Sequence, residues 1–166
     1  DFEKFRDMDC YMGIDLSSTS DLTCAAFMFP TAEKYYFKVK YYLPEMALQE
    51  KRFKELYGEW RRKGLITITP GNVTDYDYIL NDILDIRDRV YIQKIAYDAW
   101  NATQFVINAQ EKALPMQEFS QALGNFNRPT KEMERLMLSG KAVIDNNVIN
   151  RHCFRNVVMA RDRNGN

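Results

Sequence analysis

Cysteine is rare in this chain, and long apolar runs are missing. The three cysteines, Cys10, Cys24 and Cys153, are an odd number without the spacing of metal-ligand pairs. We therefore expect reduced, buried thiols with neither a disulfide nor a zinc site. The longest apolar stretches, such as residues 24–30, are too short to cross a bilayer, and nothing at the amino end resembles a signal peptide. The sequence thus indicates a soluble, intracellular protein.

Net charge is also absent. The 166 residues include 23 lysines and arginines and 23 aspartates and glutamates, so the formal net charge is zero. A polyanionic partner such as nucleic acid would have to be attracted by local basic clusters or by a metal ion. Two candidate clusters contain Arg61, Arg62 and Lys63, and Arg151, His152, Arg155, Arg161 and Arg163. Short basic runs are commonly solvated surface, so alone they define no site.

Two aspartates lie within or directly after apolar segments. Asp15 is inside a β-prone run at residues 11–16, where an unpaired carboxylate costs several kcal/mol unless a metal ion or a cation compensates it. Asp98 ends a second run of strand length at residues 91–98. On adjacent parallel strands the two carboxylates would form a hard-cation site. For Asp15, an outward-facing strand position or pairing with a lysine or arginine is the alternative.

The first third of the chain is rich in strand-forming residues. We predict strands at residues 10–16, 22–29 and 34–42, and their short connections indicate a three-stranded antiparallel meander. A turn of small hydroxyl residues follows the first strand, and Asp21 in it is expected to cap backbone amides. Residues 1–9 are polar and are predicted to be a linker or lead-in, whereas residues 10–166 form one domain with enough apolar material for a full core.

Helical periodicity begins after the meander. One helix is predicted at residues 44–63, with Gly64 just beyond its end. Its buried face should contain Phe53, Leu56, Tyr57 and Trp60. A capping box at Thr74 to Asp77 predicts a second helix ending near Arg89. We predict further extended segments at residues 65–69, 91–98, 114–119 and 141–144, and a polar loop at residues 121–128. Three more helices are predicted: from Asn101 or Thr103 to Lys112, from a cap at Thr130 to about Leu138, and from Asn147 to Met159. The last of these should have Ile149, Cys153 and Val157 on one face.

This order of elements predicts an α/β fold with a mixed sheet flanked by helices. The first strand would be central, with the antiparallel meander on one side and the later parallel strands on the other. The strand at residues 91–98 can then neighbour the strand at residues 10–16. Topology alone therefore predicts that Asp15 and Asp98 converge.

The element order and the two aspartates resemble the ribonuclease H-like superfamily. Residues 13–17 (Gly-Ile-Asp-Leu-Ser) and 97–102 (Tyr-Asp-Ala-Trp-Asn-Ala) resemble the two acidic motifs in the nuclease domain of phage or prophage terminase large subunits. Residues 71–76 and positions spread through residues 129–166 are similar to further segments of that family. Val148 stands where the family often has proline and His152 where it has tryptophan, which suggests local repacking.

The resemblance implies a magnesium- or manganese-dependent endonuclease that uses two ions. Asp15 would anchor both ions and Asp98 would hold one, while the third acidic ligand of the family would lie beyond Asn166. The domain would therefore be truncated at its C-terminal end, and the fragment would cut weakly or not at all. His152, the single histidine, is expected to pack or to contact phosphate, because two-metal chemistry requires no general base.

The implied role is cleavage of concatemeric double-stranded DNA during genome packaging, in the cytoplasm of an infected or lysogenic bacterium. Arg61, Arg62, Arg151 and Arg155 would position the duplex through its phosphates, and such contacts carry no sequence information. An ATPase motor domain would precede Asp1. The small terminase subunit and the portal are further candidate partners, and no membrane contact is expected.

Other functions are open to the same fold. A sugar-kinase or actin-like ATPase needs a glycine soon after the first aspartate, but Leu16 and Ser17 stand there and glycine-rich phosphate loops are missing elsewhere. From a different class, the domain would be a catalytically silent module for DNA binding or motor docking. The presence of both Asp15 and Asp98 favours the nuclease.

Overall fold

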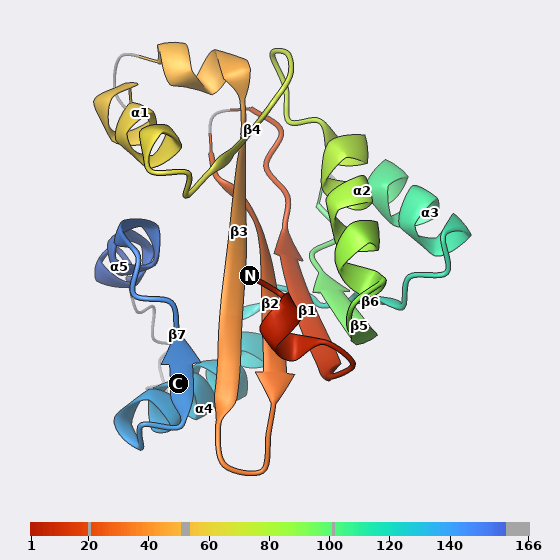
Figure 1. The fold of residues 1–166 in the computed structure, drawn as a ribbon, viewed down its shortest axis with the longest axis vertical. Coiled ribbons are helices and arrows are strands. Elements are labelled where there is room, and N and C mark those ends of the chain that lie inside the picture. Colours follow the sequence, from red (N-terminus) through yellow and green to blue (C-terminus); the bar gives the residue numbers. More distant parts are fainter. Residues whose placement is uncertain (20, 51–53, 101, 159–166) are drawn as a thin grey trace.

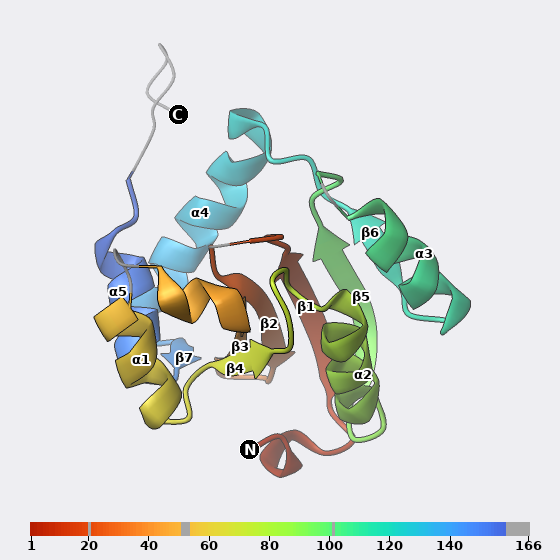
Figure 2. The ribbon, with the colours of Figure 1, turned by 90° about the horizontal axis from the view of Figure 1, so that it is seen from above.

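The computed structural model describes residues 1–19, 21–50, 54–100 and 102–158. These residues form a seven-stranded mixed sheet with helices on both faces (Figures 1 and 2). The strands are β1 (Asp9–Asp15), β2 (Thr23–Pro30), β3 (Tyr35–Pro44), β4 (Thr67–Thr69), β5 (Tyr91–Tyr97), β6 (Met116–Glu118) and β7 (Ala142–Ile144). The helices are the 3₁₀ turns η1 (Glu3–Phe5) and η2 (Glu45–Gln49), and α1 (Lys54–Arg62), α2 (Tyr76–Arg87), α3 (Thr103–Glu111), α4 (Leu123–Leu138) and α5 (Val148–Arg155).

The strand order is β4-β3-β2-β1-β5-β6, and β7 pairs with β3. Strand β2 is antiparallel to both β1 and β3, whereas β5 runs parallel to β1 on its other side. The short strands β4 and β7 pair in parallel with opposite ends of β3. The predictions of an antiparallel meander, of a central first strand and of later parallel strands are therefore confirmed.

Helices α2 and α3 cover one face of the sheet, and their apolar side chains form the larger core with β1, β2 and β5 (Figure 2). The turn η1 joins this core, because Phe5 is 2% exposed and its ring stacks on Phe29 with centroids 4.1 Å apart. The predicted lead-in therefore packs against the sheet through this side chain.

Helices α1 and α5 pack on the opposite face, mainly against β3, and α4 lies on that side too (Figure 2). Trp60 and Ile149 are fully buried there. The rings of Trp60 and His152 meet edge to face with centroids 5.3 Å apart. The Tyr41 hydroxyl donates a hydrogen bond to the side-chain oxygen of Asn150. His152 of α5 is thus exposed but contacts α1 through the Trp60 ring.

Two predicted helices have different bounds. The single helix predicted at residues 44–63 is wrong: η2 ends at Gln49, and Glu50 is extended (φ −64°, ψ 119°), before α1 begins at Lys54. Phe53 lies outside the described residues. Helix α5 ends at Arg155 rather than Met159, and Val157 is 61% exposed, so it does not share the buried face.

The loop predicted at residues 121–128 and the cap predicted at Thr130 are also wrong. Helix α4 begins at Leu123 and continues through Pro129. Its first turn is fixed by tertiary contacts: Phe126 meets Phe119 edge to face with centroids 5.5 Å apart, and the Asn125 amide donates to the Ser120 carbonyl (3.0 Å). Leu136 is the one buried residue of α4, and Pro129 lies inside the helix, whereas a proline in a sequence usually marks a helix boundary.

Helix caps differ in detail as well. Asp75, not Thr74, caps α2, and its carboxylate accepts a hydrogen bond from the Tyr78 backbone N–H (3.0 Å). Helix α3 follows Ala102, which offers no side-chain cap, and Asn101 lies outside the described residues. Gly64 has φ 66° at the end of α1, the left-handed conformation that favours glycine there.

The described cysteines are all free. Within the described ranges, no helix has the length and apolar character needed to span a membrane.

We expect Phe5→Ala to lower the free energy of unfolding by about 3–5 kcal/mol, because it removes a buried, stacked ring and leaves a cavity. Urea titration followed by circular dichroism measures this change. Phe154→Ala is the matched control, since Phe154 is 44% exposed and its loss should change stability by less than about 1 kcal/mol. Equal effects of the two substitutions would show that η1 is not part of the core.

Candidate functional site

The two predicted acidic residues lie side by side. In the parallel pair of β1 and β5, Ile14 is opposite Tyr97, so the next residue of each chain segment, Asp15 and Asp98, stands at the same carboxyl edge of the sheet. Ile14 points into the larger core, and side chains alternate along a strand. Asp15 therefore points to the opposite face of the sheet, on the side of α4 and α5.

A β-bulge sets this register. Asp9 pairs with Tyr91 and Cys10 with Ile92, but Tyr11 pairs with Lys94, so Gln93 is an extra residue of β5. The Gln93 amide donates to the Asp9 carboxylate (2.8 Å), which holds the bulge in place. Without the extra residue, the position opposite Asp15 would be taken by Tyr97. Bulges commonly re-aim side chains beside functional sites.

Negative charge is concentrated at this edge. The pKa of Asp15 is raised above its usual value, first by partial burial and then by the charges of Asp98 and Asp21. Asp21 was expected to cap backbone amides, but in the described part of the chain no hydrogen bond involves its side chain. Instead, its charge adds to the field at Asp15.

The backbone around both aspartates is held in place. The Thr23 hydroxyl is fully buried, accepts from the Ser17 backbone N–H (2.8 Å) and donates to the Ser17 carbonyl (2.9 Å), which closes the loop after β1 at its base. On the other side, the Asp98 carboxylate accepts from the Trp100 backbone N–H (3.5 Å). Hydrogen bonds at the end of β1 and just after β5 thus hold the backbone next to Asp15 and next to Asp98.

Small residues form the sheet surface next to the aspartates. Gly13 pairs with Ala26 of β2 and with Ala96 of β5. A Cβ atom added to Gly13 would meet no atom within 4 Å, so the space above the glycine is open. Cys24 lies opposite Asp15, and burial, together with the Asp15 charge, raises the pKa of its thiol to about 12. The surface beside the acids is therefore open and its thiol stays neutral.

This donor set fits a hard divalent cation. Two carboxylates that repel each other at one edge would be stabilised by a shared ion, and oxygen ligands suit Mg²⁺ and Mn²⁺. Within the described ranges, no group of three or more His, Cys, Asp or Glu side chains is placed to hold a metal ion. Asp15 and Asp98 are therefore candidate ligands that would make up part of a metal site.

The four predicted DNA-binding arginines lie elsewhere on the domain. Arg61 and Arg62 are exposed at the end of α1, and Arg151 and Arg155 are exposed on α5. The structure places the two pairs on neighbouring helices, joined by the Trp60 and His152 contact. In the described part of the chain, no hydrogen bond or ion pair connects these arginines with Asp15 or Asp98.

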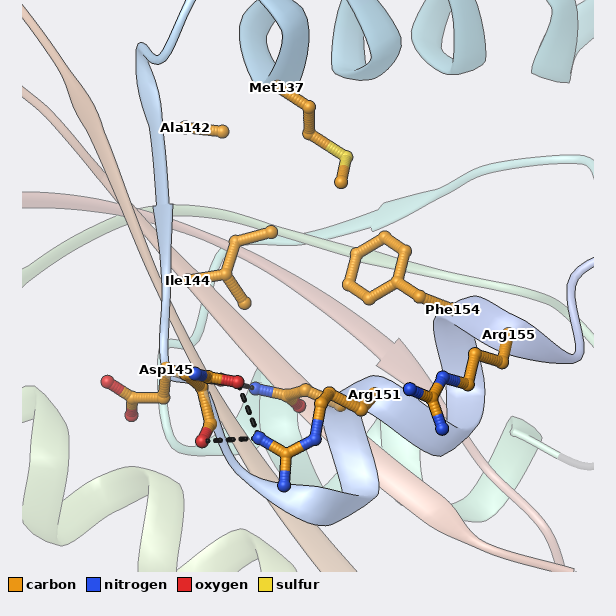
Figure 3. A pocket seen from close by; sticks show the side chains of 9 residues that line it. Met137, Ala142, Ile144, Asp145, Arg151, Phe154 and Arg155 are labelled. Carbon is orange, nitrogen blue, oxygen red and sulfur yellow. Dashed lines mark hydrogen bonds between the residues drawn. The ribbon is translucent and has the colours of Figure 1, made fainter.

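Arg151 and Arg155 line a pocket of about 400 Å³ between α4, β7 and α5 (Figure 3). Arg151 donates to the Asn146 carbonyl (3.1 Å) and side-chain oxygen, which carry no charge. Asp145, at the rim, points away and is paired with Lys38 (2.7 Å). The two arginines have no acidic partner within the described ranges, so this surface carries uncompensated positive charge.

Sequence reasoning missed one conspicuous side chain. Trp100 follows Asp98 by two residues and is 78% exposed. Its position within the motif at residues 97–102 was visible, but exposure of a side chain in a turn has no periodic pattern that would predict it.

Comparison of the fold with solved structures defines the class of protein. The structure is similar to the crystal structure of the HK97 bacteriophage large terminase, with a TM-score of 0.85 and 29% identity, covering 96% of this chain and 34% of that chain. It also resembles the large terminase nuclease from thermophilic phage G20c with bound magnesium (TM-score 0.62, 10% identity, 96% of this chain, 70% of that chain). At that identity the likeness shows the fold alone. The fold is therefore the ribonuclease H-like fold of terminase nucleases, as predicted.

The sequence then identifies the family. Residues 1–166 match the family described as terminase large subunit, endonuclease domain, and the chain belongs to this family. The large subunit of the terminase of Enterobacteria phage HK97 is 29% identical over 161 residues, covering 94% of this chain and 32% of the relative. Protein YmfN of Escherichia coli K12 is 25% identical over 167 residues, covering 94% and 37%. The chain spans about a third of the length of these curated relatives.

We expect Asp15→Asn to raise the midpoint temperature of unfolding at pH 7.5 in the presence of EDTA. Folding raises the pKa of Asp15, so this carboxyl supports the folded state below its unfolded pKa, and the contribution is lost as pH rises through the folded pKa. The gain from asparagine should therefore be largest at pH 7.5 and fade as pH falls toward 3.8, the usual value. Scanning fluorimetry across this range measures it.

Asp85→Asn is the control, because Asp85 is an exposed aspartate on α2. It should give no gain that grows with pH. A gain of the same size in both variants would mean that Asp15 is not under electrostatic strain.

Proposed function

We propose that this domain is a metal-dependent endonuclease that cleaves concatemeric double-stranded DNA during phage genome packaging, by two-metal hydrolysis of the phosphodiester bond. The observation that carries the proposal is the juxtaposition of Asp15 and Asp98 at one sheet edge, where the pKa of Asp15 is raised by burial and by neighbouring carboxylates. Membership of the terminase endonuclease family supports it.

Asp15 would anchor both Mg²⁺ or Mn²⁺ ions, and Asp98 would hold one of them. When bound, the two ions supply an activated water, a stabilised pentavalent charge and a neutralised leaving oxygen, leaving a 5′ phosphate and a 3′ hydroxyl. The open surface above Gly13 gives a phosphodiester access to this edge. A third carboxylate from beyond Asn166 would complete the ligand set, so the 166-residue chain by itself would cut weakly or not at all.

The duplex would be positioned through its phosphates by Arg61, Arg62, Arg151 and Arg155. Arg151 and Arg155 are free to take phosphate because no acidic side chain within the described ranges neutralises them. Contacts of this kind orient DNA without reading its sequence.

In the whole protein, the domain would act with an ATPase motor domain upstream of Asp1. The small terminase subunit and the portal are further partners that we propose, and the site of action would be the bacterial cytoplasm. The chain covers about a third of its curated relatives, which leaves room for a motor domain in proteins of their length.

The second candidate function is a catalytically silent module for DNA binding or motor docking. The specific observation in its favour is that the described residues offer two carboxylates, Asp15 and Asp98, and no group of three metal-binding side chains. Cleavage by the full-length protein separates the two functions.

We expect Asp15→Asn and Asp98→Asn, each in the full-length protein, to lower the rate of plasmid cleavage in Mg²⁺ by more than about 100-fold. Removing even an outer partner of a metal ligand costs about 10–100-fold, so loss of a ligand should exceed that. Calorimetric titration of Mn²⁺ should also show weaker binding to each variant.

Asp85→Asn is again the control and should cut as the wild type does, while EDTA should stop cleavage in both. DNA binding without nicking by the wild type, unaffected by metal, would support the silent module. Indistinguishable Mn²⁺ isotherms for the wild type and Asp15→Asn would exclude the proposed metal site.

We expect the double substitution Arg151→Gln and Arg155→Gln to weaken duplex binding and to reduce the slope of log Kobs against log salt by about 1.8. Each phosphate contact contributes about 0.9 to this slope. Fluorescence anisotropy of a labelled duplex over a series of KCl concentrations measures it. The control pair Arg87→Gln and Arg89→Gln removes two charges from the α2 side of the sheet and should leave the slope unchanged; an equal loss there would indicate only a general charge effect.

A further inference from the structure

Trp100 is the feature that the proposed chemistry leaves unexplained. Its side chain is 78% exposed, whereas the other tryptophan, Trp60, is fully buried. Tryptophan is among the most buried residue types on average, because its indole carries a large apolar surface. In the described part of the chain, no aromatic ring packs against Trp100. A large exposed ring beside a candidate site is therefore a candidate contact for a bound molecule.

The backbone of Trp100 is held although its side chain is free. Its N–H donates to the Asp98 carboxylate (3.5 Å), and the Ala102 N–H donates to the Ala99 carbonyl (3.4 Å), a hydrogen bond that spans Trp100. Ala102 is 1% exposed and belongs to the larger core. The indole is therefore presented from an anchored turn rather than from a free loop.

The anchor also fixes how far the indole is from the acidic edge. Two residues of chain span at most about 7 Å, so the Cα of Trp100 lies within that distance of the Cα of Asp98. Successive nucleotides of one strand are separated by about 3.4 Å along the duplex axis. A strand whose phosphate is bound by the ions that Asp15 and Asp98 would hold thus has its neighbouring nucleotide within reach of the indole.

We propose that Trp100 contacts the DNA next to the phosphate that is cut, with its indole face against the sugar and base of the adjoining nucleotide. This inference rests on the proposed endonuclease function and adds a positioning residue to it. Aromatic side chains stack on exposed bases or wedge between base steps, and such contacts tolerate any sequence because every base has a flat face. A nuclease that does not read bases can use a contact of this kind.

A covering protein segment is the competing explanation for an exposed indole. Any segment packed on Trp100, including the one beyond Asn166 that would bring the third carboxylate, must leave the space through which the duplex reaches Asp15. Because DNA has to reach the edge beside Trp100 in the proposed function, DNA is the occupant that we propose, and the acrylamide test below detects a protein segment instead.

Kinetics of the full-length protein provide the first test. We expect Trp100→Ala to raise the KM for a linear duplex by about 5- to 150-fold, the range expected from loss of one base-aromatic stack, with kcat changed by less than about 5-fold. Trp100→Phe should restore KM to within about 5-fold of the wild type. Tyr91→Ala is the matched control, because Tyr91 is a 57% exposed aromatic at the opposite end of β5 and should leave KM unchanged.

Fluorescence provides a readout that a merely structural role would not change. The difference between the emission of the full-length wild type and that of Trp100→Phe isolates Trp100. In the Asp15→Asn background, which prevents cleavage, a fluorescein-labelled 30-base-pair duplex should quench this difference signal in parallel with the rise in anisotropy of the DNA. Without DNA, acrylamide should quench it readily.

The outcomes separate the two proposals. An unchanged difference signal while the DNA binds, or an indole already shielded from acrylamide in the DNA-free protein, overturns the Trp100 contact. Cleavage by Asp15→Asn at the wild-type rate overturns the endonuclease site, and the fluorescence result still decides whether Trp100 touches DNA. Failure of the duplex to bind overturns both.

Discussion

The parallel pairing of β1 with β5, in one register, is the constraint on which the candidate site depends. Asp15 and Asp98 are 83 positions apart in the chain, and only the ladder between these strands brings them to the same edge. The bulge at Gln93 fixes the phase of that ladder. A shift of one residue would place Tyr97 opposite Asp15 and would turn the β5 side chains to the wrong faces of the sheet. The bulge at Gln93, which is distant from the two aspartates, therefore helps to determine that they face each other.

The negative charges at this edge repel one another, and packing elsewhere in the fold keeps them close. Asp15 stands among like charges, but the preceding residue, Ile14, and Ile95 of the neighbouring strand are buried in the larger core. The Thr23 hydroxyl closes the neighbouring loop. Burial of apolar side chains on the face of α2 and α3 thus keeps carboxylates adjacent that would separate in water. The candidate site is thus stabilised from the opposite side of the sheet.

The sequence was informative where a local pattern was enough to fix the structure. Short turns between apolar strands specify the meander, and the long connection before residues 91–98 specifies a parallel neighbour, so the convergence of Asp15 and Asp98 was predictable. The start of α4 was not, because the contact between Phe119 and Phe126 fixes it and a proline lies within the helix. The influence of Asp21 on Asp15 and the exposure of Trp100 likewise arise only in three dimensions, since loop conformation sets both.

On the side away from β2, strand β3 is paired, within the described part of the chain, only at its two ends. Strand β7 pairs with Tyr35–Phe37 and β4 pairs with Tyr42–Pro44, so within the described ranges no strand joins residues 38–41 on that side. The interval is only four residues long, and it contains Lys38 and Lys40, which are paired with Asp145 and Asp82. A foreign strand would find too few free backbone groups and two charged side chains there. The sheet thereby resists self-association through its longest strand.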